Sequence, residues 1–171
     1  LLDDVDLAPP YVLVGHSFGG LLIRLYASNH IPDVAGLVLV DAPHEQQYEE
    51  AQKRVSAQTW EMVSAFWKRG TEAIDLVHEV SQIEPIVSMD DIPLIVLSAT
   101  EKEVLPPEIP LEMARELEEV SSIIEPSFQK KLAAESTRGQ HIAVEGAGHE
   151  IHLQRPDVVI EAIRNLVLAT R

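Results

Sequence analysis

Residues 11–27 read YVLVGHSFGGLLIRLYA. An apolar run of the β type leads into Gly15, and an apolar pattern of helical spacing follows Gly20. Between them, residues 15–19 fit the pattern G-x-S-x-G with Ser17 at its centre. In a sharp turn from strand to helix, the serine adopts a strained backbone conformation, and the neighbouring glycines leave room for it. The serine hydroxyl then lies at the carboxyl end of the sheet. The stretch therefore predicts a nucleophile elbow, in which the Phe18 N–H and the helix amino terminus stabilise negative charge on an attacked carbonyl oxygen.

The rest of the chain predicts an α/β fold. Four short runs are β-like, and the first three are almost continuously apolar: Tyr11–Val14, Gly36–Val40, Pro93–Leu97 and His141–Val144. Such runs suit strands that are buried on both faces of a parallel sheet. Helical patterns lie between them and at the chain end. The alternation predicts a mostly parallel, doubly wound sheet that is flanked by helices.

The segment 44–88 separates the second and third predicted strands and is helical in pattern. A simple crossover needs only about a dozen residues. We interpret the segment as an inserted helical cap, with residues 1–43 and 89–171 forming the core; the alternative is an elaborate crossover that only covers the sheet.

Composition excludes several classes of function. The chain of 171 residues carries 13 Lys and Arg against 28 Asp and Glu, a net charge of -15, which argues against nucleic acid as a partner. There is no cysteine, and no run approaches the length of a membrane span. The first residues do not resemble a signal peptide, so a cytoplasmic location is expected. No cofactor motif is present, because GHSFGG is neither a P-loop nor a dinucleotide fingerprint.

A serine hydroxyl needs a base, and among the seven histidines His149 has the best context. It lies in the loop EGAGHEIHLQRP, after the fourth predicted strand and before the last helix. His16 is expected to be structural or to line the substrate pocket, and His152 to pack nearby. His149 and His152 suggest a metal pair, but the sequence offers no convincing third ligand, so no metal site is expected.

Four segments, in this order, resemble the second half of an α/β-hydrolase: GHSFGG after YVLV, GLVLVDAPHE, IPLIVLSAT and GAGHEIHLQRPDVVIEAI. The resemblance implies a catalytic triad, with Ser17 as the nucleophile and His149 as the general base and then acid. The family often places its acid in a G-x-x-D motif after the third strand seen here, where this chain has SATEKEVLPP. Asp41 is favoured as the acid, since some family members carry it after the preceding strand; Glu103 and then Glu101 are the alternatives.

The family also has strands before the elbow, whereas only ten residues precede Tyr11 here. The second oxyanion donor normally comes from that region. Without it, the strand Tyr11–Val14 becomes an exposed apolar edge. We hypothesise that a missing N-terminal half of a longer hydrolase covers this edge, or that a truncated form hides it in a homodimer.

Two functions remain open at this point. The first is a serine hydrolase that cleaves an ester, amide or related acyl bond of a small molecule through an acyl-enzyme. The second is a non-catalytic or truncated module of the same fold that acts in binding or self-association. Phe66 and Trp67 are candidates for an apolar substrate pocket, although the core of the cap itself is the favoured place for such aromatic residues.

Overall fold

The structure of the chain is a computed structural model that describes residues 7–67, 76–83, 86, 88–102 and 105–170. Its elements, in chain order, are β1 (Tyr11–His16), α1 (Phe18–Asn29), the 3₁₀ helix η2 (Ile31–Asp33), β2 (Val34–Val40), α2 (Gln47–Gln52), α3 (Ala57–Trp67), α4 (Leu76–Ser81), β3 (Leu94–Ala99), α5 (Leu111–Ala134), β4 (Gly139–Val144), α6 (Ile151–Gln154) and α7 (Pro156–Ala169). The chain forms two compact units. The first comprises Leu1–Pro43, Ile86–Lys102 and Gln129–Arg171, and the second comprises His44–Pro85 and Glu103–Phe128.

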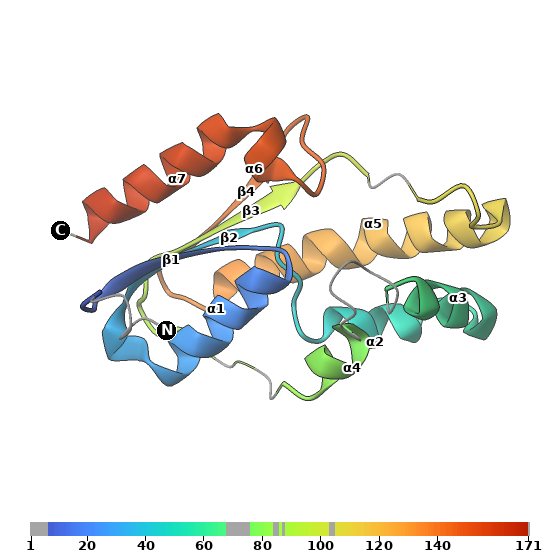
Figure 1. Cartoon of the computed structure of the whole chain (residues 1–171), viewed down its shortest axis with the longest axis horizontal. Coiled ribbons are helices and arrows are strands. Elements are labelled where there is room, and N and C mark those ends of the chain that lie inside the picture. The colour runs from blue at the N-terminus through green and yellow to red at the C-terminus, as the bar shows by residue number, and fades with distance from the viewer. Residues whose placement is uncertain (1–6, 68–75, 84–85, 87, 103–104, 171) are drawn as a thin grey trace. The chain divides into compact units, whose positions relative to one another are not determined.

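A four-stranded sheet organises the first unit. All neighbouring strands are parallel, and their order across the sheet is β1-β2-β3-β4. Helix α1 covers one face of this sheet and α7 covers the other (Figure 1). The predicted α/β fold with a parallel sheet and flanking helices is therefore confirmed, and each strand lies within two residues of its predicted bounds at either end.

Strand β2 contributes to an apolar core on each face of the sheet. Leu37 and Leu39 belong to one core, together with Ala27 of α1. Val38 and Val40 belong to the other, together with residues of α7 such as Leu166. Because successive side chains of a strand point to opposite faces, a continuous apolar run is what a strand covered on both sides requires.

A buried ion pair fixes α1 to the end of α5. The Arg24 side chain is fully buried, and its Nε donates to Oε2 of Glu135 at 2.9 Å. A second guanidinium nitrogen donates to the other carboxylate oxygen, so the pair is bidentate. The backbone carbonyl of Glu135 also accepts the amide of Met89 at 2.7 Å, which ties the same point to the approach to β3. Arg24 lies seven residues beyond Ser17, so this pair anchors the helix that follows the elbow.

The second unit has its own small core and a polar contact at the start of α3. Val120, Ile124 and Phe128 of α5 form a buried cluster against Ala51 and Val55. The Glu116 carboxylate accepts hydrogen bonds from the Thr59 hydroxyl and from the amide of Ser56, and these bonds lower the pKa of Glu116 below its ordinary value.

The segment 44–88, for which the sequence predicts a cap, supplies much of the second unit, which also includes Glu103–Phe128. Its role as a cap stays a prediction.

The sheet ends at β1 on one side and at β4 on the other, within the part of the chain that the structure describes. Val14 of β1 is 43% exposed. No helix among the described residues is long and apolar enough to cross a membrane.

Replacing Arg24 by methionine leaves the Glu135 carboxylate buried without its guanidinium partner. We expect Arg24→Met to lower the free energy of unfolding by about 3–5 kcal/mol. Replacing both residues, in Arg24→Met/Glu135→Met, is expected to cost less than the sum of the two single changes, because no charge is then left unpaired. Urea denaturation followed by circular dichroism measures both effects. Single variants that unfold at the wild-type urea concentration would contradict the anchoring role of the pair.

Candidate active site

Ser17 lies on a strained turn between the last residue of β1 and the first residue of α1. Its backbone has φ 52° and ψ -129°, in the region of positive φ that side chains with a Cβ rarely adopt. Such a residue costs on the order of 1–3 kcal/mol and persists only where its surroundings hold it. Here the amide of Ser17 donates to the carbonyl of Val40 at 2.9 Å, and its carbonyl accepts the amide of Gly20 at 2.9 Å.

Two glycines allow the chain to turn this tightly. A Cβ on Gly15 would lie 2.6 Å from the carbonyl oxygen of Gly19, and one on Gly20 would lie 2.4 Å from the Cβ of Ala42. Real Cβ atoms do not approach other atoms so closely, so the first turn of α1 can pack against β1 and the end of β2 only without side chains at these positions. The glycines at positions 15 and 20 therefore have a steric cause in the structure.

Asp41 directly follows β2, at the same edge of the sheet as Ser17. The parallel register pairs His16 with Val40, so Ser17 and Asp41 are the next residues of two neighbouring strands. Asp41 also has a positive φ, 46°, and its amide donates to the carbonyl of Leu97 at 2.8 Å. One of its carboxylate oxygens, Oδ1, accepts the amide of Ala99 at 2.9 Å. The carboxylate is thus held in place by the backbone at the end of β3.

The other carboxylate oxygen binds His149. Nδ1 of His149 lies 2.7 Å from Oδ2 of Asp41. An ionised carboxylate can only accept, so Nδ1 carries the proton and Nε2 is left with a lone pair. The side chain of Asp41 is 20% exposed and that of His149 is 39% exposed. This is a histidine–acid pair of the kind that orients an imidazole as a base.

His16 packs against His149. The two ring centroids are 4.7 Å apart, and Nε2 of His16 is 3.0 Å from the backbone carbonyl oxygen of His149. His16 precedes Ser17 in the chain. The structure therefore brings together His16, Asp41 and His149 around the turn that carries Ser17.

The other candidate acids are placed differently. Glu101 is exposed in the turn after β3, where its amide and that of Thr100 both donate to the carbonyl of Ala147 at 3.0 Å. These backbone bonds hold the loop that carries His149. Glu103 lies outside the described residues.

The remaining predicted site residues lie in two helices. Phe18 is the first residue of α1, where backbone N–H groups lack intrahelical acceptors. Phe66 and Trp67 end α3, in the second unit, and their side chains lie outside what the structure describes.

Sequence reasoning overlooked Glu150 at this site. Its Oε2 lies 3.9 Å from Nε2 of His16 and 3.5 Å from Nε2 of His152. The rings of His16 and His152 are also in contact, with centroids 4.5 Å apart. The signal available in the sequence is the run H-E-x-H at residues 149–152, but nothing in it points to His16.

A serine and a histidine form a hydrogen-bonded pair within the sheet. The Ser98 hydroxyl of β3 is 2.8 Å from Nε2 of His141 of β4. Burial, and after it the positive charge of Lys130, lower the pKa of His141, which favours the neutral imidazole. Ser98 lies within a strand rather than on a strained turn, so the pair lacks the arrangement found at Ser17.

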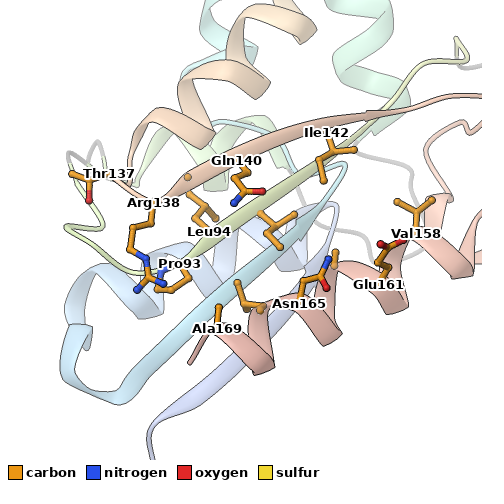
Figure 2. Close-up of a pocket in the computed structure, with 14 residues that line it drawn as sticks. Pro93, Leu94, Thr137, Arg138, Gln140, Ile142, Val158, Glu161, Asn165 and Ala169 are labelled. Atoms are coloured by element: carbon orange, nitrogen blue, oxygen red, sulfur yellow. The ribbon is translucent and has the colours of Figure 1, made fainter. Parts of the chain in front are cut away.

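A cavity of about 610 Å³ lies elsewhere in the first unit, between α7 and the β3–β4 side of the sheet (Figure 2). It is lined from the beginnings of β3 and β4, including Leu94 and Gly139, and from residues of α7 such as Glu161 and Asn165. None of the predicted site residues lines it. The chemistry at the carboxyl ends of β1 and β2, rather than this cavity, marks the candidate active site.

Comparison with known proteins fits this geometry. Residues 1–162 match the profile described as "Alpha/beta hydrolase family". The chain belongs to this family. Its expected likeness to α/β-hydrolases, stated above from the sequence segments, is thereby confirmed.

Solved structures of similar fold include three bacterial proteins. A "probable hydrolytic enzyme" from Pseudomonas aeruginosa PAO1 is 15% identical, with a TM-score of 0.56, over 96% of this chain and 65% of its own. An alpha/beta hydrolase fold protein from Nakamurella multipartita is 16% identical, with a TM-score of 0.58, over 99% of this chain and 72% of its own. A thermophilic esterase from Thermogutta terrifontis is 18% identical, with a TM-score of 0.57, over 99% of this chain and 68% of its own. At these identities the likeness shows the fold alone.

An uncharacterized protein of Schizosaccharomyces pombe is 38% identical over 50 residues, which cover 29% of this chain and 9% of that protein. The chain thus spans less than two thirds of both the Pseudomonas protein and the yeast protein.

Gly19 and Gly20 differ in the space around them, and this difference can be tested. A Cβ on Gly20 would collide with Ala42, whereas a Cβ on Gly19 would meet nothing within 4 Å. We expect Gly20→Ala to lower the free energy of unfolding by about 1–3 kcal/mol, because α1 must move away from β2. Gly19→Ala is the matched control and is expected to be neutral or slightly stabilising, because alanine is the better helix former. Urea denaturation compares them, and equal stabilities would show that the close approach is unimportant.

Proposed function

We propose that this chain carries the catalytic site of a serine hydrolase that cleaves an ester, amide or related acyl bond of a small molecule. The observation that carries the proposal is the 2.7 Å hydrogen bond between Nδ1 of His149 and Asp41, beside a serine on a strained turn. The pair supplies an oriented base, and the turn supplies a nucleophile at the same edge of the sheet. Membership in the alpha/beta hydrolase family supports the same conclusion.

In the proposed reaction, the Ser17 hydroxyl attacks the acyl carbonyl carbon while Nε2 of His149 takes its proton. Asp41 keeps Nδ1 protonated and stabilises the imidazolium that forms. The Phe18 N–H donates to the developing oxyanion at the amino terminus of α1. Imidazolium then protonates the leaving group, which departs and leaves an acyl-enzyme on Ser17. A water molecule, deprotonated by His149, releases the acid and regenerates the serine.

Asp41 is our choice for the acid because its two carboxylate oxygens have separate tasks. Oδ1 is held by the Ala99 amide at 2.9 Å, and Oδ2 faces His149. A carboxylate fixed by the backbone holds the imidazole in one orientation, which a flexible glutamate on an exposed turn does less well. Glu101 is such an exposed residue.

The residues proposed to contact the acyl group come mainly from the sequence. His16 touches His149 and is placed to contact a bound substrate. Phe66 and Trp67 stay predicted pocket residues, and a small-molecule acyl substrate stays the predicted partner. The cover over the β1 edge, a second copy or further chain, also stays a prediction; it is motivated by the 43% exposure of Val14.

A fluorophosphonate probe tests the proposal, because it reacts only with an activated serine. We expect the wild-type chain to be labelled, and Ser17→Ala and His149→Ala to remain unlabelled. Asp41→Asn is expected to slow labelling by orders of magnitude, as much as about 10⁴-fold, because an asparagine can stabilise the wrong imidazole tautomer. Glu101→Gln is the matched control and is expected to label at the wild-type rate.

The alternative function, a non-catalytic module of the same fold, predicts the opposite. A chain with a folded circular dichroism spectrum that takes up no probe would support it. Loss of labelling in Glu101→Gln together with normal labelling in Asp41→Asn would reject Asp41 as the acid and leave the serine mechanism in place.

A further inference from the structure

The carboxylate and imidazoles beside His149 form a cluster that the proposed triad does not use. His16 ends β1, and Glu150 and His152 lie at the start of α6. Each of these three side chains offers one ligand atom, and the three atoms lie within 4.8 Å of one another. We propose that His16, Glu150 and His152 bind a zinc-class divalent transition-metal ion, and that the bound ion slows the reaction at Ser17.

The donor set points to zinc rather than to magnesium or calcium. Two imidazole nitrogens and one carboxylate oxygen are ligands that zinc accepts, whereas the hard cations prefer oxygen alone. The sequence alone offers no convincing third ligand beside His149 and His152, and no metal site is expected from it. The structure supplies Glu150 between two imidazoles, and one of these, His16, is distant in sequence.

The distances require only small side-chain movements. Ligand atoms around a tetrahedral zinc ion with bonds of about 2.0–2.1 Å lie roughly 3.3–3.4 Å apart. Oε2 of Glu150 is already 3.5 Å from Nε2 of His152 and 3.9 Å from Nε2 of His16. The three side chains are 29%, 49% and 38% exposed for His16, Glu150 and His152, so an ion and a completing water molecule can reach them from solvent.

Metal binding would use an imidazole of His152 that has a nitrogen unpaired among the described residues, and it would remove an existing contact of His16. Nδ1 of His152 is buried and makes no hydrogen bond in the described structure, so this imidazole is not committed elsewhere. Nε2 of His16 lies 3.0 Å from the carbonyl oxygen of His149, and this contact is lost if the same nitrogen binds the metal. Metal binding therefore acts directly on the backbone of the catalytic histidine.

The effect on the reaction rests on the proposed function. His149 must hold its ring in one orientation to accept the Ser17 proton, and this ring is 4.7 Å from that of His16. Coordination of Nε2 of His16 removes its 3.0 Å contact with the carbonyl oxygen of His149, so the residue that carries the base loses one of the contacts that position it. The ion is thus expected to inhibit without touching Ser17.

Isothermal titration of the metal-free chain with zinc chloride tests the binding. We expect one zinc ion per chain, and at least a tenfold weaker dissociation constant in Glu150→Gln and in His152→Ala. Glu150→Gln changes one exposed side chain without altering its size, so loss of folding does not confuse the result. His30→Ala is the matched control: His30 also has a carboxylate neighbour, Asp33, at 3.9 Å, but belongs to no three-ligand group among the described residues. Magnesium chloride is expected to give no heat of binding.

Absence of zinc binding, or equal affinity in wild type, Glu150→Gln and His152→Ala, would overturn the site. This measurement needs no catalytic activity, so it succeeds or fails independently of the proposed hydrolase. The rate of fluorophosphonate labelling with and without zinc then tests the coupling. Slower labelling in wild type, with a smaller slowing in His152→Ala, supports it. Zinc that binds but leaves the wild-type labelling rate unchanged would overturn the inhibitory role.

Discussion

The close contact between the first turn of α1 and the ends of β1 and β2 is the constraint on which the candidate site depends. Gly20 faces Ala42 with no room for a Cβ, and Gly15 leaves space for the next turn of chain. The amide of Ser17 can then reach the carbonyl of Val40. Because the register pairs His16 with Val40, the residues that follow, Ser17 and Asp41, leave neighbouring strands at the same level. Steric contact and strand register together set the spacing between Ser17 and Asp41.

The strained backbone of Ser17 and Asp41 is held in place by hydrogen bonds and by packing elsewhere in the first unit. Ser17 and Asp41 both have positive φ, which is unfavourable for residues with a side chain. Each is held by backbone hydrogen bonds to an adjacent strand, and α1 is fixed at its middle by the buried pair of Arg24 and Glu135. Rigid elements on both sides of the turn keep the side chains in a geometry that the local sequence alone would not favour. This arrangement is what a preorganised active site requires.

Local patterns predicted the fold well because the information is local. A strand covered on both faces needs a continuous apolar run, and β2 shows one directly. Helix α5 is less local in origin: it continues as one helix from Leu111 to Ala134 although Pro126 lies inside it. A proline removes one backbone donor, but Val120, Ile124 and Phe128 keep a common buried face across it. Packing therefore outweighs the local cost of the proline.

Local patterns also nominate part of the candidate site. The glycine pattern singles out Ser17 as a candidate, and the G-A-G-H loop singles out His149. The sequence left three candidate acids, because the distance between Asp41 and His149 depends on a contact across 108 positions of the chain. The proximity of Glu150 to His16 is likewise a product of the fold. Residues that meet only through the sheet leave no periodic signal in one sequence.

The loop that carries His149 is tied to the end of β3 by the main chain and by one side chain. The carbonyl of Ala147 accepts the amides of Thr100 and Glu101, and Oγ1 of Thr100 donates to the carbonyl of Val144 and accepts the amide of Gly146. Glu101 contributes a backbone amide to this tether, which almost any residue would supply, whereas Thr100 also contributes its hydroxyl. The side chain at position 101 can therefore vary in charge and size while the loop stays in place, but position 100 requires a hydroxyl.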